Sequence, residues 1–110
     1  MDFLTPQEQA AIDAFKAEVL QRLGSQVVSF TLFGSRARGE GDEESDVDIL
    51  VLLKEADSVS RRAVYELVAD ILLDYEIDIS PLVLSQDHYE DMKKRERLLP
   101  LDIERDGRLL

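Results

Sequence analysis

The sequence contains no cysteine. The chain therefore forms neither disulfides nor thiolate metal sites, which excludes a small disulfide-stapled secreted scaffold and a cysteine-ligated zinc site. Long apolar runs are also missing, because none approaches the roughly 20 residues that span a bilayer. The amino terminus lacks the basic segment and apolar core of an export signal. These absences predict a cytoplasmic protein without membrane segments.

Basic residues are scarce, with 13 lysines and arginines against 24 aspartates and glutamates, and the formal net charge is −11. This negative charge disfavours electrostatic attraction to the phosphate backbone of nucleic acids, so we expect no direct binding of nucleic acid. A single nucleotide is a different case, because divalent cations held by carboxylates invert the charge that its phosphates meet. The acidity also suits a basic protein partner.

The pattern of apolar residues predicts one domain over residues 1–110. The expected elements, in chain order, are a helix over 6–23, strands over 27–33 and 46–53, a helix over 58–75 and a strand over 77–84. Capping residues and the helical spacing of apolar residues predict the helices, and short runs of β-branched residues predict the strands. We predict an α/β (α+β) fold, with a small mixed sheet of three to four strands flanked by helices.

The carboxyl-terminal part is less regular. Ser85 is a plausible cap for a last helix, which we expect to stop near Pro100, and residues 103–110 are expected to form a turn with a short apolar tail. Pro81 suggests that the strand over 77–84 lies at an edge of the sheet, because proline cannot donate to a strand ladder.

Three carboxylates are expected to meet at one edge of this sheet. The long helix between the strands that begin at 46 and 77 favours parallel pairing, so both strands start at the same edge. Asp46 and Asp48 lie two residues apart and therefore share a face, while Asp78 is the second residue of the next expected strand. Such a set suits a two-metal site with Mg²⁺ ions roughly 3.5–4 Å apart.

The short connection after Phe33 favours an antiparallel return, which brings Gly34 and Ser35 to the same edge. Gly34 lets the backbone approach a phosphate oxygen, and Ser35 adds a hydroxyl and an amide. Arg36 and Arg38 pair either with phosphate oxygens or with the neighbouring acidic loop, and the sequence leaves both interpretations open. His88 stands alone and is expected to be an exposed helix residue rather than a ligand.

The segment Gly34-Ser35-Arg36-Ala37-Arg38-Gly39, followed by Asp46-Val47-Asp48, resembles the signature of the DNA polymerase β-like nucleotidyltransferase superfamily. It is most similar to the minimal nucleotidyltransferase branch, whose members are antitoxins of HEPN-domain toxins. The resemblance covers nearly the whole chain. It implies the polymerase β-like nucleotidyltransferase fold.

The resemblance also implies an activity: transfer of a nucleoside monophosphate, usually AMP from ATP, to a hydroxyl, with release of pyrophosphate. In the family, the residues matching Gly34 and Ser35 hold the triphosphate, and those matching Asp46 and Asp48 bind two Mg²⁺ ions. Asp78 matches the third carboxylate, which ligates the catalytic metal and helps to deprotonate the acceptor. The resemblance further implies a cognate HEPN toxin as partner and one of its tyrosines as acceptor.

Two other functions stay open at this stage. The chain would act as a binding module if it neutralised its partner by contact alone, with a vestigial site. Alternatively, it would transfer the nucleotide to a small hydroxylated molecule such as an aminoglycoside. Neither the base preference of the nucleotide nor the oligomeric state, alone or with the toxin, follows from the sequence.

Overall fold

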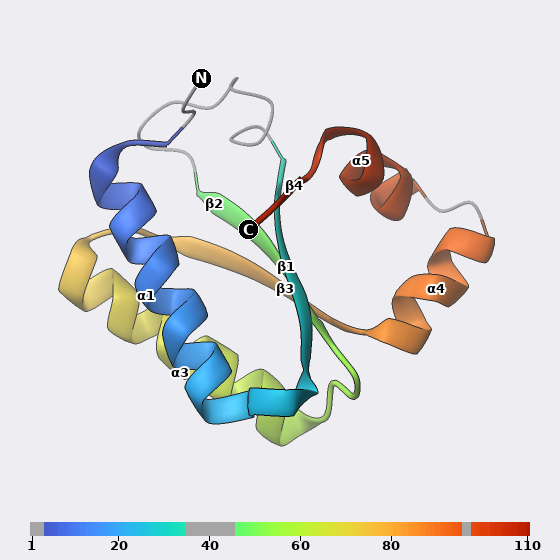
Figure 1. The fold of residues 1–110 in the computed structure, drawn as a ribbon, viewed down its shortest axis with the longest axis horizontal. Coiled ribbons are helices and arrows are strands. Elements are labelled where there is room, and N and C mark those ends of the chain that lie inside the picture. Colours follow the sequence, from blue (N-terminus) through green and yellow to red (C-terminus); the bar gives the residue numbers. More distant parts are fainter. Residues whose placement is uncertain (1–3, 35–45, 96–97) are drawn as a thin grey trace.

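The computed structural model describes residues 4–34, 46–95 and 98–110. In chain order the elements are α1 (Pro6–Leu23), the 3-10 turn η1 (Gly24–Gln26), β1 (Val27–Phe33), β2 (Val47–Leu53), α3 (Ser58–Tyr75), β3 (Ile79–Ser85), α4 (Gln86–Lys94), α5 (Leu98–Asp106) and β4 (Arg108–Leu109). Figure 1 shows α1 and α3 packed on one side of a twisted sheet, with α4 and α5 on the other. The predicted mixed sheet flanked by helices is confirmed.

The sheet has the strand order β3-β2-β1-β4. β1 and β2 are antiparallel, whereas β2 and β3 are parallel, as the lengths of their connections predict. β3 is an edge strand and contains Pro81, which agrees with the position that proline favours. This topology brings the end of β1 and the starts of β2 and β3 together at one end of the sheet, where the three predicted carboxylates lie. We call this end of the sheet the catalytic edge, as distinct from the lateral edge that β3 forms.

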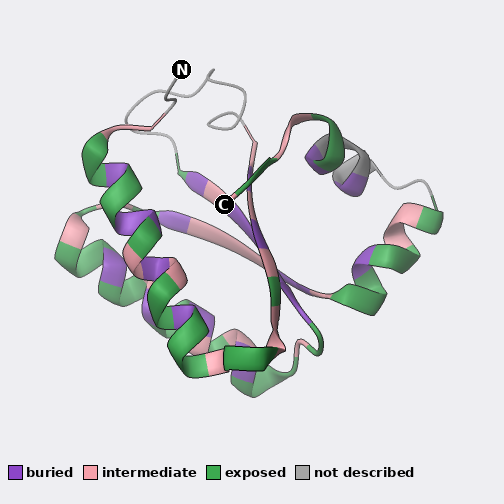
Figure 2. Cartoon of the chain, in the orientation of Figure 1, coloured by how far each residue is buried: buried purple, intermediate pink, exposed green. Residues whose placement is uncertain are grey.

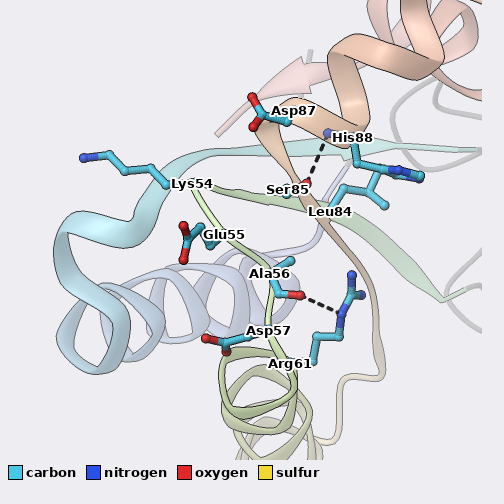
Figure 3. Close-up of a pocket in the computed structure, with 9 residues that line it drawn as sticks. All are labelled: Lys54, Glu55, Ala56, Asp57, Arg61, Leu84, Ser85, Asp87 and His88. Atoms are coloured by element: carbon cyan, nitrogen blue, oxygen red, sulfur yellow. Dashed lines mark hydrogen bonds between the residues drawn. The ribbon is translucent and has the colours of Figure 1, made fainter.

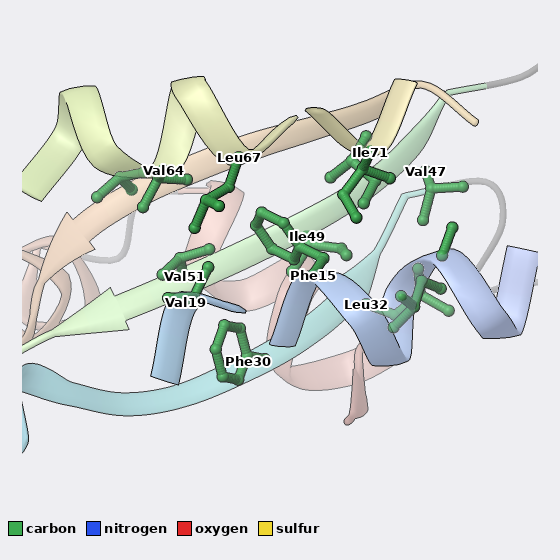
Figure 4. Packing of buried hydrophobic residues seen from close by; sticks show 14 of the residues in the cluster. Phe15, Val19, Phe30, Leu32, Val47, Ile49, Val51, Val64, Leu67 and Ile71 are labelled. Carbon is green, nitrogen blue, oxygen red and sulfur yellow. The ribbon is translucent and has the colours of Figure 1, made fainter. Parts of the chain in front are cut away.

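The larger core lies between the sheet and the helix pair α1 and α3. β2 contributes alternate residues, Val47 to Leu53, to this face, and Phe15 packs edge-to-face on Phe30 with ring centroids 6.2 Å apart. Figure 4 shows these side chains filling the space between the helices and the strands, and Figure 2 shows the exposed residues of both helices turned outward. Burial on this scale supplies most of the folding free energy.

A smaller core covers the opposite face of β2. Leu50 and Leu52 pack there with Tyr89 of α4 and Ile103 of α5. Side chains of a strand alternate between its faces, so Asp46 and Asp48 point to this same side as Leu50 and Leu52. The carboxylates therefore continue the face that α4 and α5 cover farther along the sheet.

The helix boundaries follow from capping. Thr5 and Glu8 form a capping box at the start of α1, with reciprocal hydrogen bonds of 3.1 and 2.8 Å between side chains and backbone N–H groups. Asp57 caps α3 by accepting from the Ser60 N–H at 2.8 Å, and Ser85 caps α4. The predicted helices over 6–23 and 58–75 are confirmed at both ends.

The carboxyl-terminal prediction is wrong in two respects. The last helix does not stop near Pro100, because α5 spans Leu98–Asp106 and Pro100 lies in its first turn. Proline is tolerated there because N–H groups of a first helical turn have no intrahelical acceptor. Residues 103–110 are also more than a turn and a tail, since β4 adds a short strand to β1.

Candidate active site

Asp46 and Asp48 lie at the start of β2 on the catalytic edge. Asp46 immediately precedes the strand and is exposed, whereas Asp48 is its second residue and is half-buried. Asp78 immediately precedes β3, and its backbone carbonyl accepts a hydrogen bond of 3.1 Å from the Val47 N–H. Continued back by one residue, the parallel register sets Asp46 beside Asp78. The three carboxylates thus begin two neighbouring strands at one edge.

Gly34 follows β1 and lies against Asp48. Its φ is +77°, a left-handed conformation that favours glycine. A Cβ atom built on Gly34 would lie 2.3 Å from Oδ2 of Asp48, well inside van der Waals contact. Phe33, the residue before it, pairs with Asp48 across the antiparallel ladder. A side chain at position 34 would therefore displace the Asp48 carboxylate from this position.

The electrostatics of Asp48 reflect its surroundings. Burial raises the pKa of Asp48 above the ordinary value of 3.8, and repulsion by the neighbouring carboxylate of Asp46 raises it further. Hydrogen bonding by the Ser80 side chain acts in the opposite direction. The like-charge pair is costly when both groups are ionised, and a bound divalent cation would relieve that cost.

The donor chemistry of the edge fits Mg²⁺, which prefers oxygen ligands and one or two protein carboxylates. Burial raises the pKa of Asp48, and repulsion by the nearby Asp46 carboxylate adds to that rise. Within residues 4–34, 46–95 and 98–110, however, no three histidine, cysteine, aspartate or glutamate side chains gather as a ready metal site. The metal set of Asp46, Asp48 and Asp78 therefore stays a prediction.

Three of the predicted nucleotide-binding residues, Ser35, Arg36 and Arg38, lie outside the described residues, as does the acidic loop that follows them. Of that group the structure places only Gly34. His88 is exposed on α4, as predicted. No helix in the described part of the chain combines the length and apolar character that crossing a membrane requires.

Ser80 is a site residue that the sequence reasoning did not identify. It is the second residue of β3, and the register pairs it with Asp48. It also lies two residues after Asp78, so both side chains share one face of the strand. That spacing is the signal that would have identified it, because any polar residue two positions after a strand-opening carboxylate faces the same site.

Two substitutions should move the pKa of Asp48 in opposite directions. Asp46→Asn removes the repulsion that raises the pKa of Asp48, so the pKa should fall, while Ser80→Ala removes a stabilising interaction with the ionised form, so it should rise. The measurement is a titration of the Asp48 carboxyl carbon by NMR in metal-free protein. Shifts of the same sign in both variants would contradict this account.

A pocket of about 490 Å³ lies at the opposite ends of β2 and β3, away from the three carboxylates. Figure 3 shows Arg61 beside it, bonded to the carbonyl of Ala56 at 3.2 Å, and its Nη1 also donates to the Val83 carbonyl at 2.7 Å. Asp57 and Ser85 at its rim cap helices. These side chains hold the fold together, so we assign the pocket no catalytic role.

Residues 12–105 match the family of nucleotidyltransferase domains. The chain belongs to this family. The nucleotidyltransferase identity expected from the Gly34–Asp48 segment is confirmed, and the fold described above is the one on which the family's chemistry takes place.

Relatives of this nucleotidyltransferase include protein adenylyltransferases. A Methanocaldococcus jannaschii protein assigned as one is 38% identical over 73 residues, which cover 66% of this chain and 74% of that protein. The protein adenylyltransferase MntA of Thermococcus cleftensis is 36% identical over 80 residues, covering 72% and 79% of the two chains. The similarity to the minimal nucleotidyltransferase branch is thereby confirmed.

Solved structures show the same fold. A chain of a toxin–antitoxin complex with AMP-PNP superposes with a TM-score of 0.55 and 19% identity, over 86% of this nucleotidyltransferase and 68% of that chain. A chain of the MntA–HpeT toxin–antitoxin complex gives a TM-score of 0.53 with 21% identity over the same shares. Both matches establish the architecture of the nucleotidyltransferase domain.

Proposed function

We propose that this nucleotidyltransferase is a cytoplasmic protein adenylyltransferase that transfers AMP from ATP to a hydroxyl of a partner toxin and thereby acts as its antitoxin. The observation that carries the proposal is the grouping of carboxylates at the start of β2, where Asp48 lies against Gly34 and Asp46 lies beside Asp78. The protein adenylyltransferases among its relatives support AMP transfer to protein. The toxin–antitoxin structures support the kind of partner.

We propose two groups of residues at the catalytic edge, one for the triphosphate and one for the metal ions. The turn from Gly34 would receive the triphosphate, with Ser35, Arg36 and Arg38 as further phosphate contacts. Asp46, Asp48 and Asp78 would hold Mg²⁺, with two ions proposed. When bound, such ions neutralise phosphate charge and lower the pKa of the acceptor hydroxyl. Because Gly34 lies against Asp48, a triphosphate received at this turn would lie beside the carboxylates.

The reaction breaks a phosphoanhydride bond of ATP and forms a phosphoester bond to the acceptor. The acceptor hydroxyl oxygen bonds to the α-phosphorus of ATP, the bond from that phosphorus to the α,β-bridging oxygen breaks, and pyrophosphate leaves. We propose that Asp78 receives the proton of the hydroxyl, because it is exposed at the start of β3, where an acceptor has access. The products are an AMP ester of the acceptor and pyrophosphate.

A HEPN-type ribonuclease toxin, modified on a tyrosine, is the acceptor that we propose. The net charge of −11 supports a partner with a basic surface, as a ribonuclease needs for its own substrate. A tyrosine hydroxyl carried on such a partner would approach the catalytic edge from solvent, since Asp46 and Asp78 are exposed there.

The experiment incubates the protein with α-labelled ATP, Mg²⁺ and the product of the adjacent gene, beside an Asp46→Asn/Asp48→Asn variant. Label on the partner that is lost in the variant supports the proposal. If no label appears and the variant still neutralises the partner, the chain is a binding module that acts by contact. If label reaches only small hydroxylated compounds such as an aminoglycoside, the antitoxin function is wrong.

A further inference from the structure

The outer side of α3 carries large apolar side chains that the fold leaves partly or largely exposed. Leu73 is 80% exposed, Tyr65 is 52% exposed and Leu72 is 45% exposed. Tyr65 and Leu72 are seven residues apart, so they lie on one face of the helix, and Leu73 adjoins them. We call these three residues the α3 surface. Exposed apolar groups grouped in this way are typical of protein interaction sites.

The α3 surface lies on the side of the helix that faces away from the core. Leu67 is buried and marks the core side. At about 100° per residue, Tyr65 and Leu72 lie roughly 160° and 140° around the helix from Leu67 in one direction, and Leu73 lies roughly 120° from Leu67 in the other direction. α3 packs on β3, whose outer edge carries no strand within the described residues. The surface is therefore open to a partner.

The end of α3 that carries Leu72 and Leu73 is anchored by hydrogen bonds and leads along the chain to the catalytic edge. The Gln7 side chain of α1 donates to the Tyr75 carbonyl, and Glu76 ends the helix in a left-handed conformation at φ 58°, with its N–H bonded to the Leu72 carbonyl. The chain then runs directly to Asp78. Because α3 covers the face of the sheet opposite to the one that Asp46 and Asp48 share with Leu50, a partner seated there reaches the carboxylates by extending past the start of β3.

Acidic residues border the α3 surface. Asp70, Asp74 and Glu76 are exposed, and none forms an ion pair with another described residue. Glu66 is partly neutralised by an ion pair of 2.9 Å with Arg22 of α1, so the remaining acidic charge gathers at the end of α3 nearest the catalytic edge. Complementarity then calls for a partner whose apolar patch is rimmed by lysine or arginine.

We infer that the α3 surface is the docking site for the partner toxin, which contributes an apolar, helical face with a basic rim. This inference rests on the proposed function. Pro81 in β3 removes a backbone donor from the strand, which disfavours docking by an added strand and favours docking through side chains. From this docking site the partner would extend past Glu76 and the start of β3 to present its acceptor hydroxyl at Asp78.

The test compares two serine substitutions on the same helix. Leu73→Ser lies in the α3 surface, and Val59→Ser is the matched control, because Val59 is 75% exposed in the first turn of α3, far from the catalytic edge. Binding to the adjacent-gene product is measured by titration calorimetry. We expect Leu73→Ser to weaken binding by roughly tenfold, Leu72→Ser/Leu73→Ser by more, and Val59→Ser by less than about twofold. Equal affinities for all variants would overturn the inference.

Further readouts separate docking from catalysis. Leu73→Ser should bind Mg²⁺ and ATP like the wild type and should label the partner normally once the partner saturates it, because only docking is weakened. If wild-type protein binds but never labels the partner, the proposed transfer is wrong, while the affinity series still tests the surface. If light scattering shows that Leu73→Ser disrupts a dimer of this chain instead, the occupant is a second copy and the toxin assignment is wrong.

Discussion

Replacing Asp48 by asparagine is expected to abolish AMP transfer while leaving the fold at least as stable as the wild type. The asparagine side chain keeps the shape of the aspartate but lacks the charge proposed to hold Mg²⁺. We expect the transfer rate to fall by more than about 1,000-fold, equivalent to about 4 kcal/mol of transition-state stabilisation. The measurement is the single-turnover rate with α-labelled ATP, and near-wild-type transfer would contradict the assignment of Asp48.

The stability of Asp48→Asn should depend on pH in a defined way. Because folding raises the pKa of Asp48, the ionised side chain destabilises the fold above that raised pKa, and the penalty disappears as the pH falls toward the ordinary value of 3.8. In metal-free protein, Asp48→Asn should therefore be more stable than the wild type at neutral pH, and the difference should vanish in acid. Denaturant unfolding at several pH values measures this. Saturating Mg²⁺ should stabilise only the wild type.

Connection length made the catalytic edge predictable from the sequence. An 18-residue helix between two strands requires a crossover, so parallel pairing of β2 and β3 followed from α3 alone. The two-residue spacing of Asp46 and Asp48 places both on one face of any strand, whatever surrounds it. Local sequence determines both features, and the structure confirms them.

The carboxyl-terminal region was not predictable in the same way. Pro100 is compatible both with the end of one helix and with the first turn of the next, and only packing of Ile103 on the smaller core distinguishes these alternatives. β4 contains two residues and therefore has no periodicity to detect. The spacing from Asp78 places Ser80 on the face of the carboxylates, but its pairing with Asp48 depends on the register with β2, which is a tertiary property.

Gly34→Ala is expected to abolish transfer for a steric reason, and Gly24→Ala provides the matched control. Both glycines have positive φ, +77° and +51°, so alanine at either position should cost on the order of 1–3 kcal/mol of unfolding free energy. At Gly24 nothing lies within 4 Å of the added Cβ, whereas at Gly34 the added Cβ lies 2.3 Å from Oδ2 of Asp48. We therefore expect folded Gly24→Ala to keep its transfer rate and Gly34→Ala to lose about 100-fold or more.

A double-mutant cycle isolates the contact between Gly34 and Asp48. If alanine at position 34 acts by displacing the carboxylate, its cost in unfolding free energy should shrink when Asp48 is also replaced by alanine, because the clash then has no partner. The backbone strain from the positive φ should persist in both backgrounds. If the two changes in unfolding free energy are additive, glycine is required at position 34 only for its backbone conformation. A coupling of roughly 1 kcal/mol or more would show that its missing side chain keeps the Asp48 carboxylate in position.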